Sequence, residues 1–227
     1  MKTHLKTKLT LASILLSFNV FAAGDLYLDH ANTDISDTAS LQNGAKLFMN
    51  YCSGCHAISF MRYNRIAQDL NLSDSLVAEH LMFAGENPGE TITTAMPKEG
   101  AVKWFGTAPP DLSLVARAKG TDWIYTYLRG FYEDDSKVFG VNNKVLENAS
   151  MPDVLWSLKE GRPEAEFDQD VRDITNFLDY VGEPAKLIRT SLGVWVLLFL
   201  GVLLVLTYLL KKEYWKDVKY GIWRPRD

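Results

Sequence analysis

Apolar residues recur at helical spacing in several stretches of the chain, whereas no stretch shows a strong alternation of apolar and polar residues. The spacing predicts helices over 40–51 and 168–181, the second with a continuous i, i+3, i+4 stripe of apolar residues. Ser73 and Thr121 are candidate N-caps of two further helices. The pattern therefore predicts a mainly α-helical fold.

Two long stretches, 86–113 and 133–153, are rich in Gly, Pro and Asn and predict loops. Gly182 and Pro184 end the helix at 168–181 and predict a short hinge after it. Long loops in a small helical domain usually carry function or wrap a ligand. These two loops are therefore candidate parts of a binding site.

The stretch from 190 to 210 carries no charge and is dominated by Leu, Val, Phe, Trp and Gly. As a helix it would be ~31 Å long, which matches the hydrocarbon core of a bilayer. A buried helix of a soluble protein is rarely apolar on every face at this length. We predict a hinge and transmembrane helix over 186–210. Lys and Arg are more numerous after the span than before it, so the basic tail 211–227 is expected in the cytoplasm.

The N-terminus combines three lysines, a short apolar run and a small-residue cleavage site at Ala22 or Ala23. This combination predicts a secretory signal peptide over 1–22. The alternative, an N-terminal membrane anchor, is disfavoured because the apolar run is short for a span. The remaining residues, 23–185, are then a periplasmic domain held at the bacterial inner membrane by one C-terminal helix.

The composition agrees with a folded domain. Of the 227 residues 47% are hydrophobic and 23% charged, which excludes a wholly disordered chain and a polytopic membrane protein. The net charge of −4 argues against a nucleic-acid binder. Residues 23–210 alone carry −10, with acidic clusters at 133–135 and 164–170. An acidic surface favours basic partners, although solubility alone also explains it.

The segment Cys52-Ser53-Gly54-Cys55-His56 has the C-x-x-C-H pattern that attaches haem c. Two thiols three residues apart at the end of a helix can reach the two vinyl groups on one edge of a porphyrin. Each thiol forms a thioether, and His56 then places an imidazole nitrogen on the iron. The motif predicts one covalently attached haem c.

Three other interpretations of the motif are weaker. A zinc site needs two more ligands, and His4, His30 and His80 have no paired spacing. A thioredoxin-like redox pair would follow a strand, whereas here a predicted helix precedes the motif. A structural disulfide fits an oxidising compartment but gives no reason for His56.

The sixth position on the iron decides the class of function. His with Met saturates the iron, raises its potential and favours electron transfer, whereas an open position favours ligand binding or catalysis. Met61 is too close to His56 in sequence to reach over the ring. Met96 and Met151 both precede a proline in a predicted loop, and spacing alone does not separate them. The full set of candidates is Met61, His80, Met82, Met96 and Met151.

The chain resembles the cytochrome c1 family, the haem subunit of quinol–cytochrome c reductase, over nearly its whole length. C-x-x-C-H alone is common to many cytochromes, whereas the Pro-Pro-Asp-Leu-Ser segment and the C-terminal anchor make the resemblance specific. The segments that carry it are Cys52–His56 followed by Phe60-Met61-Arg62-Tyr63, Ala108-Pro109-Pro110-Asp111-Leu112-Ser113 with Arg117-Ala118-Lys119, Met151-Pro152 before Val154-Leu155-Trp156, and the late apolar span followed by Trp215 and Arg224-Pro225-Arg226.

The resemblance implies a cytochrome c-like fold in which the helix at 168–181 crosses the first helix near Gly44 and Phe48. It also implies that Met151 is the axial ligand opposite His56, which leaves Met96 to packing. Pro109 and Pro110 would shape the haem wall. Arg117 or Lys119 would neutralise a haem propionate, although a solvated basic pair is an equal alternative.

The implied function is a one-electron relay from a Rieske iron–sulfur protein to a soluble cytochrome c or similar carrier. The membrane helix would pack in the lipid bilayer beside cytochrome b, in a dimeric complex. The alternatives are an anchored monohaem subunit of a terminal oxidase, a haem enzyme with an open distal site such as a peroxidase, and a structural anchor with a vestigial motif.

Overall fold

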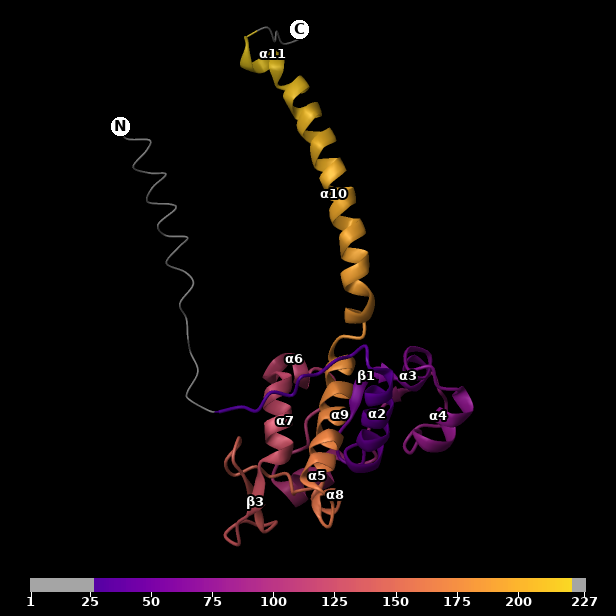
Figure 1. Cartoon of the computed structure of the whole chain (residues 1–227), viewed down its shortest axis with the longest axis vertical. Coiled ribbons are helices and arrows are strands. Elements are labelled where there is room, and N and C mark those ends of the chain that lie inside the picture. The colour runs from indigo at the N-terminus through magenta and orange to yellow at the C-terminus, as the bar shows by residue number, and fades with distance from the viewer. Residues whose placement is uncertain (1–26, 222–227) are drawn as a thin grey trace, which may run out of the picture.

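The computed structural model describes residues 27–221 and consists of a helical head from which one long helix extends (Figure 1). The predicted signal peptide and the last residues of the basic tail lie outside the described residues.

Two helices, α2 (Thr38–Tyr51) and α9 (Glu164–Gly182), cross at the centre of the head. They meet at Gly44, where a Cβ atom would lie only 2.0 Å from the carbonyl oxygen of Asp173. One turn further on, the rings of Phe48 and Phe177 lie 5.7 Å apart. The crossing that the resemblance implied is therefore confirmed, and it depends on a glycine that lets two backbones touch.

A buried carboxylate fixes how these two helices meet. Asp173 is 4% exposed. It accepts hydrogen bonds from Ser40 Oγ at 2.7 Å, Asn43 Nδ2 at 2.7 Å and Gln169 Nε2 at 2.8 Å. A charge can be buried only where hydrogen bonds replace its hydration. Since two of the donors come from α2, the network holds α2 and α9 in one register.

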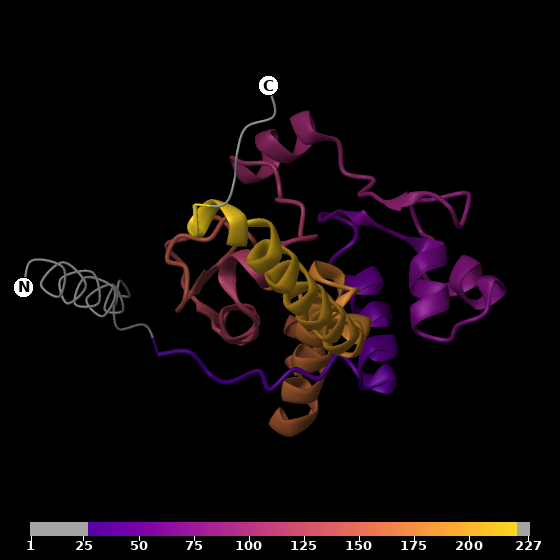
Figure 2. The ribbon, with the colours of Figure 1, turned by 90° about the horizontal axis from the view of Figure 1, so that it is seen from above.

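The remaining helices of the head flank this pair. In Figures 1 and 2, α7 lies on one side of α9 and α2 on the other, with α3 and α4 beyond α2. The bounds are α3 Tyr63–Asp69, α4 Asp74–His80, α5 Lys98–Phe105, α6 Val115–Lys119, α7 Thr121–Arg129 and α8 Trp156–Lys159.

The four predicted helices are present, with differences at their ends. α2 begins two residues and α9 four residues before the predicted starts, and the added residues carry little apolar signal apart from the buried Phe167. Ser73 caps α4 as predicted by accepting the N–H of Leu76 at 3.2 Å. The Thr121 cap was wrong: Gly120 is the N-cap, with φ 91°, and Thr121 is already helical.

The stretches predicted as loops contain short regular elements. The loop at 86–113 holds α5 and β2 (Thr91–Ile92), which pairs antiparallel with β1 (Ile58–Arg62). The loop at 133–153 holds β4 (Val141–Asn143), which pairs antiparallel with β3 (Phe131–Glu133). Strands of two to five residues are too short to show a clear alternation of apolar and polar residues, so the pattern does not predict them.

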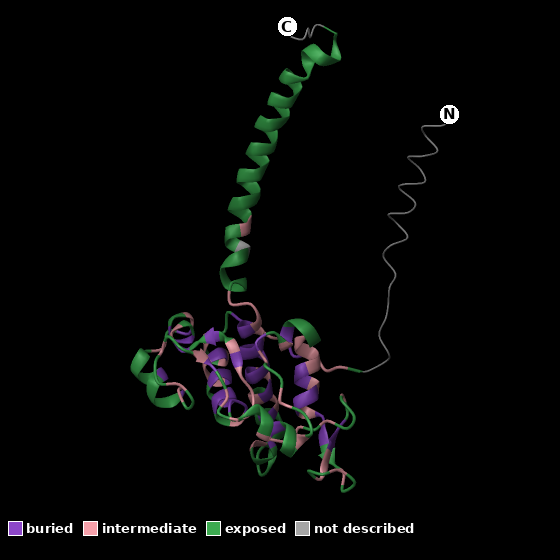
Figure 3. Cartoon of the chain, turned by 180° about the vertical axis from the view of Figure 1, so that it is seen from behind, coloured by how far each residue is buried: buried purple, intermediate pink, exposed green. Residues whose placement is uncertain are grey.

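A long helix, α10 (Lys186–Tyr214), leaves the head after a break at 183–185 and is followed by the short α11 (Lys216–Lys219). Its apolar part spans 24 residues, 191–214, none of them buried and nearly all exposed (Figure 3). These residues extend ~36 Å at helical rise, enough to cross a bilayer. An exposed apolar surface of this size is stable only when something covers it. Helix α10 therefore corresponds to the membrane helix that the sequence predicts.

Candidate haem site

A cavity of about 490 Å³ opens in the head, within the range of about 300–1,000 Å³ typical of small-molecule sites. Most of its lining is apolar. It is walled by the end of α2, the stretch 105–115, α7, the stretch 146–154 and the middle of α9. Cys52, Cys55, His56 and Met151 all line it, so the fold brings the attachment motif and one predicted ligand to a single cavity.

The attachment motif forms a tight turn at the end of α2. Cys52 is the C-cap of α2, and its carbonyl accepts the N–H groups of Cys55 at 3.1 Å and His56 at 2.9 Å. Thr94 Oγ1 donates to the Gly54 carbonyl at 2.8 Å and ties a neighbouring segment to the turn. This geometry directs both thiols and the imidazole to one cavity.

Cys52 and Cys55 are not joined by a disulfide bond. Burial raises the pKa of Cys52 to about 12 and also raises the pKa of Cys55 above its ordinary value. Thiols in such surroundings favour their neutral form at neutral pH. Among the described residues, no group of three or more His, Cys, Asp and Glu side chains is placed to hold a metal ion.

The tautomer of His56 follows from one hydrogen bond. Its Nδ1 lies 2.8 Å from the carbonyl oxygen of Pro110. A carbonyl can only accept, so Nδ1 carries the hydrogen and Nε2 keeps its lone pair. Burial lowers the pKa of His56, although the Pro110 carbonyl and the charge of Asp111 oppose this. A neutral imidazole with a free Nε2 is the form that ligates iron. The hydrogen bond to the Pro110 carbonyl sets the orientation of this ring.

The Pro-Pro-Asp-Leu-Ser segment is tied to the chain that follows the motif. Asp111 accepts the N–H of Ser59 at 3.0 Å and of Ser113 at 2.8 Å, and Ser113 Oγ accepts the N–H of Phe60 at 3.1 Å. Burial works to raise the pKa of Asp111, but the hydrogen bonds from Ser113 and Ser59 bring it below its ordinary value. An ionised Asp111 thus fixes the segment from which Pro110 orients His56.

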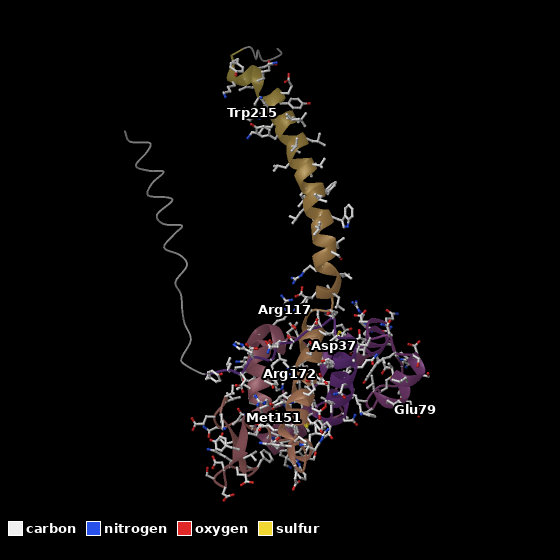
Figure 4. All side chains as sticks on the ribbon, in the orientation of Figure 1. Asp37, Glu79, Arg117, Met151, Arg172 and Trp215 are labelled. Carbon is white, nitrogen blue, oxygen red and sulfur yellow. The ribbon has the colours of Figure 1, made fainter. Side chains whose placement is uncertain are left out.

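Met151 lines the cavity, and the other candidate ligands do not. The hydroxyl of Tyr127 donates to Met151 Sδ at 3.6 Å. Figure 4 shows Met151 inside the head, well away from the end that bears α10. The others lie elsewhere. Met61 is buried in the core, and the half-buried Met82 packs against it. Met96 is half-buried, and its N–H donates to Thr94 Oγ1, whereas His80 is exposed at the end of α4.

Tyr127 is a site residue that the sequence did not reveal. Burial raises the pKa of Tyr127 to about 12, so it remains a phenol that can donate to the Met151 sulfur. Trp123 stacks on its ring at 4.9 Å with an interplanar angle of 7°. In the sequence both residues belong to the apolar stripe of a helix, and nothing in that stripe marks a hydroxyl that contacts a methionine.

The two basic candidates lie in different places. Lys119 lines the cavity and sits 5.5 Å over the ring of Trp123. Arg117 does not line it and instead pairs with Glu183 at 3.0 Å, near the end of the head from which α10 leaves (Figure 4). Of the two, Lys119 is therefore the one placed to meet a charged group of a ligand in the cavity.

The residues present fit a haem c. Two thiols, an imidazole with a free Nε2 and a thioether face one largely apolar cavity, which also has a basic side chain on its wall. These are the groups that attach a porphyrin covalently and fill both axial positions of its iron.

Comparison with known proteins agrees with this fit. The sequence model of the Cytochrome C1 family matches residues 30–218. The chain is 47% identical to the cytochrome c1 of Allochromatium vinosum, over 93% of this chain and 99% of that protein. It is 43% identical to a Nitrosomonas europaea protein named ammonia monooxygenase gamma subunit, over 92% and 97%. It is 32% identical to the cytochrome c1 of Rhodospirillum rubrum, over 81% and 84%. The chain belongs to the cytochrome c1 family, the membrane-anchored haem subunit of the respiratory bc1 complex.

Proposed function

We propose that this chain relays single electrons from a Rieske iron–sulfur protein to a soluble cytochrome c or similar carrier. The observation that carries the proposal is the single cavity that Cys52, Cys55, His56 and Met151 share. A haem bound there supplies a one-electron iron couple. Beside cytochrome b, in a dimeric complex, α10 would anchor the head in the bacterial inner membrane.

Each residue of the site has a distinct task in this relay. Cys52 and Cys55 hold the porphyrin through thioethers, so that the head retains it in an exported compartment. His56 presents Nε2 in an orientation set by the Pro110 carbonyl. Met151 supplies a neutral sulfur whose lone pairs are shared with the Tyr127 hydroxyl. Lys119 is the candidate partner of a propionate.

Covalent attachment of one haem is tested by removing the thiols. In the double variant Cys52→Ala/Cys55→Ala, we expect loss of all haem that survives acid extraction, while the wild type keeps one haem per chain. Ser53→Ala is the control: it removes only the hydrogen bond from Ser53 Oγ to the Met49 carbonyl, at a cost of about 1 kcal/mol. Acid-stable haem in the double variant would rule out thioether attachment.

Topology is tested with reporters, because the positive-inside rule predicts a periplasmic head and a cytoplasmic tail. A reporter fused after Asp227 should be active only if it works in the cytoplasm. Activity of a periplasm-dependent reporter at this position would reverse the orientation. Truncation before Ser191 should release a soluble head that keeps its haem, since the apolar span begins there.

The structure narrows the acidic surface that a basic carrier would use. Within 164–170, Asp168 pairs with Arg129, and Glu166 and Asp170 pair with Arg162, which leaves Glu164 as the member of this described cluster without an ion pair. Among the described residues, Glu133 and Asp135 form no ion pair, and both are exposed. Their loop also bears Phe139, whose ring lies 5.4 Å from that of the cavity residue Phe105. A carrier held there would be close to the haem.

We expect the second-order rate with a basic carrier to fall as salt rises, because the Debye length shortens to about 10 Å at 0.1 M. The double variant Glu133→Gln/Asp135→Asn should react more slowly at low salt and show a weaker salt dependence. Glu79→Gln, on α4 away from this loop (Figure 4), is the matched control and should leave both unchanged. A salt dependence identical in all three proteins would remove the 133–135 loop from the docking surface.

A further inference from the structure

Two neighbouring asparagines in the predicted loop at 133–153 are buried. Asn143 is 2% exposed and Asn142 is 4% exposed, and neither lines the haem cavity. A buried amide is costly unless its donor and acceptor groups are hydrogen-bonded. The partners of these two side chains therefore show what they hold in place.

The side chain of Asn143 joins helix α7 to the start of the loop that carries Met151. Its Nδ2 donates to the Tyr127 carbonyl at 2.8 Å. Its Oδ1 accepts the N–H groups of Val145 at 2.8 Å and Leu146 at 3.3 Å. One amide thus fixes the backbone at Tyr127 and, at the same time, the first turn of the loop.

Asn142 extends the same arrangement along the loop. Its Oδ1 accepts the N–H groups of Asn143 and Asn148, both at 2.9 Å, and its Nδ2 donates to Asp134 Oδ2 at 3.0 Å. Asn148 lines the cavity three residues before Met151. The two amides together therefore control the path of the chain from β4 to the cavity.

Gly130 leaves the space that this arrangement needs. A Cβ on Gly130 would lie 3.3 Å from Asn143 Oδ1 and 2.8 Å from the Thr126 carbonyl oxygen. The backbone bond from Lys144 N to the Gly130 carbonyl, at 3.0 Å, closes the loop on the end of α7. The end of α7 is thus shaped to receive the Asn143 side chain.

We propose that Asn143 is a positioning residue for the axial thioether, which it holds over the iron by fixing the loop 144–151 against α7. The proposal rests on the proposed ligand role of Met151. Tyr127 makes the link direct: Asn143 binds its carbonyl, and its hydroxyl contacts the Met151 sulfur. Helix α7 therefore binds both the start of the loop, through the Tyr127 carbonyl, and the Met151 sulfur, through the Tyr127 hydroxyl.

The test uses carbon monoxide as a probe of the open iron site in the reduced, full-length holoprotein. Asn143→Leu removes all three hydrogen bonds and leaves the N–H groups of Val145 and Leu146 without their acceptor. We expect the rate of carbon monoxide binding to rise roughly 30-fold. At 1.4 kcal/mol per factor of ten, this corresponds to a loss of about 2 kcal/mol in the free energy that holds the loop 144–151 against α7. Asn50→Leu, at an exposed asparagine of α2, should bind carbon monoxide as slowly as the wild type.

Asn143→Asp gives a second readout that a general loss of stability would not produce. When protonated, the introduced carboxyl can donate to the Tyr127 carbonyl and still accept the two N–H groups. When ionised, it places a charged oxygen against that carbonyl. We expect slow carbon monoxide binding at low pH and fast binding as pH rises, with burial moving this transition above the ordinary Asp range. The same titration of Asn143→Leu should be flat apart from the change seen in the wild type.

The outcomes separate the two proposals. If the wild type itself binds carbon monoxide readily, the Met151 ligation under "Proposed function" fails. If the wild type excludes it and both Asn143 variants also exclude it at every pH, Asn143 does not position the ligand. Should Asn143→Leu yield no holoprotein, the pH dependence of Asn143→Asp decides alone, and a flat profile overturns the proposal.

Discussion

Replacing Met151 with Leu should leave the haem attached but lower its reduction potential by a large part of the ~0.8 V that axial ligands can span. Cys52 and Cys55 are untouched, so the thioethers remain. Leu keeps the volume of Met and removes the sulfur, a soft neutral ligand that favours ferrous iron. The Tyr127 hydroxyl also loses its partner. Reduction by the Rieske protein should then fail, although the complex still assembles.

The measurement is a redox titration of the full-length holoprotein, together with its spin state and its binding of carbon monoxide. The variant should become high-spin or accept an exogenous ligand. Met96→Leu is the matched control: Met96 also precedes a proline and is half-buried, but it does not line the cavity. It should cost under about 1.5 kcal/mol and leave the potential unchanged. If Met96→Leu opens the iron and Met151→Leu does not, the ligand assignment is wrong.

The comparison of these two methionines shows where sequence reasoning reaches its limit. Both stand before a proline in a stretch without helical periodicity, so their local chemistry is the same. What separates them is position in three dimensions: Met151 lines the cavity, whereas Met96 is hydrogen-bonded to Thr94, the residue that contacts Gly54. Contacts between residues far apart in the chain determine which methionine lines the cavity, and local sequence patterns do not predict such contacts.

The same reason explains which elements could be predicted. α2 and α9 extend over 14 and 19 residues, which is long enough for the helical spacing of their apolar residues to show in the sequence, although the second half of α9 is buried on nearly every side. α6 and α8, with five and four residues, are too short to show a period. Asn142 and Asn143 lie in a stretch predicted as a loop, where asparagine is common because it favours turns. Their burial results from the pairing of β3 with β4 and from the space at Gly130.

The second large effect concerns the crossing of α2 and α9, where Gly44→Ala should strongly destabilise the head. In an open helix this change would add about 0.5–1 kcal/mol of stability, because alanine loses less backbone entropy than glycine. At Gly44 the new Cβ would lie 2.0 Å from the carbonyl oxygen of Asp173 and 2.7 Å from its carbon. These are backbone atoms, so no side-chain rotation relieves the clash. The helices must separate, which also stretches the hydrogen bonds from Ser40 and Asn43 to Asp173.

We expect a net loss of at least about 2 kcal/mol in the free energy of unfolding, the middle of the range for overpacked cores. Urea unfolding of the holoprotein measures it, and the attached haem gives an independent optical signal. Gly100→Ala on α5 is the matched control, because its Cβ would meet only side-chain atoms, the nearest at 3.5 Å. That variant should be neutral or slightly more stable. If Gly44→Ala unfolds within about 0.5 kcal/mol of the wild type, as an ordinary surface change would, the two backbones do not touch at this crossing. In the expected case, separating α2 from α9 also displaces Cys52 at the end of α2 from Met151, so the binding of carbon monoxide should rise together with the loss of stability.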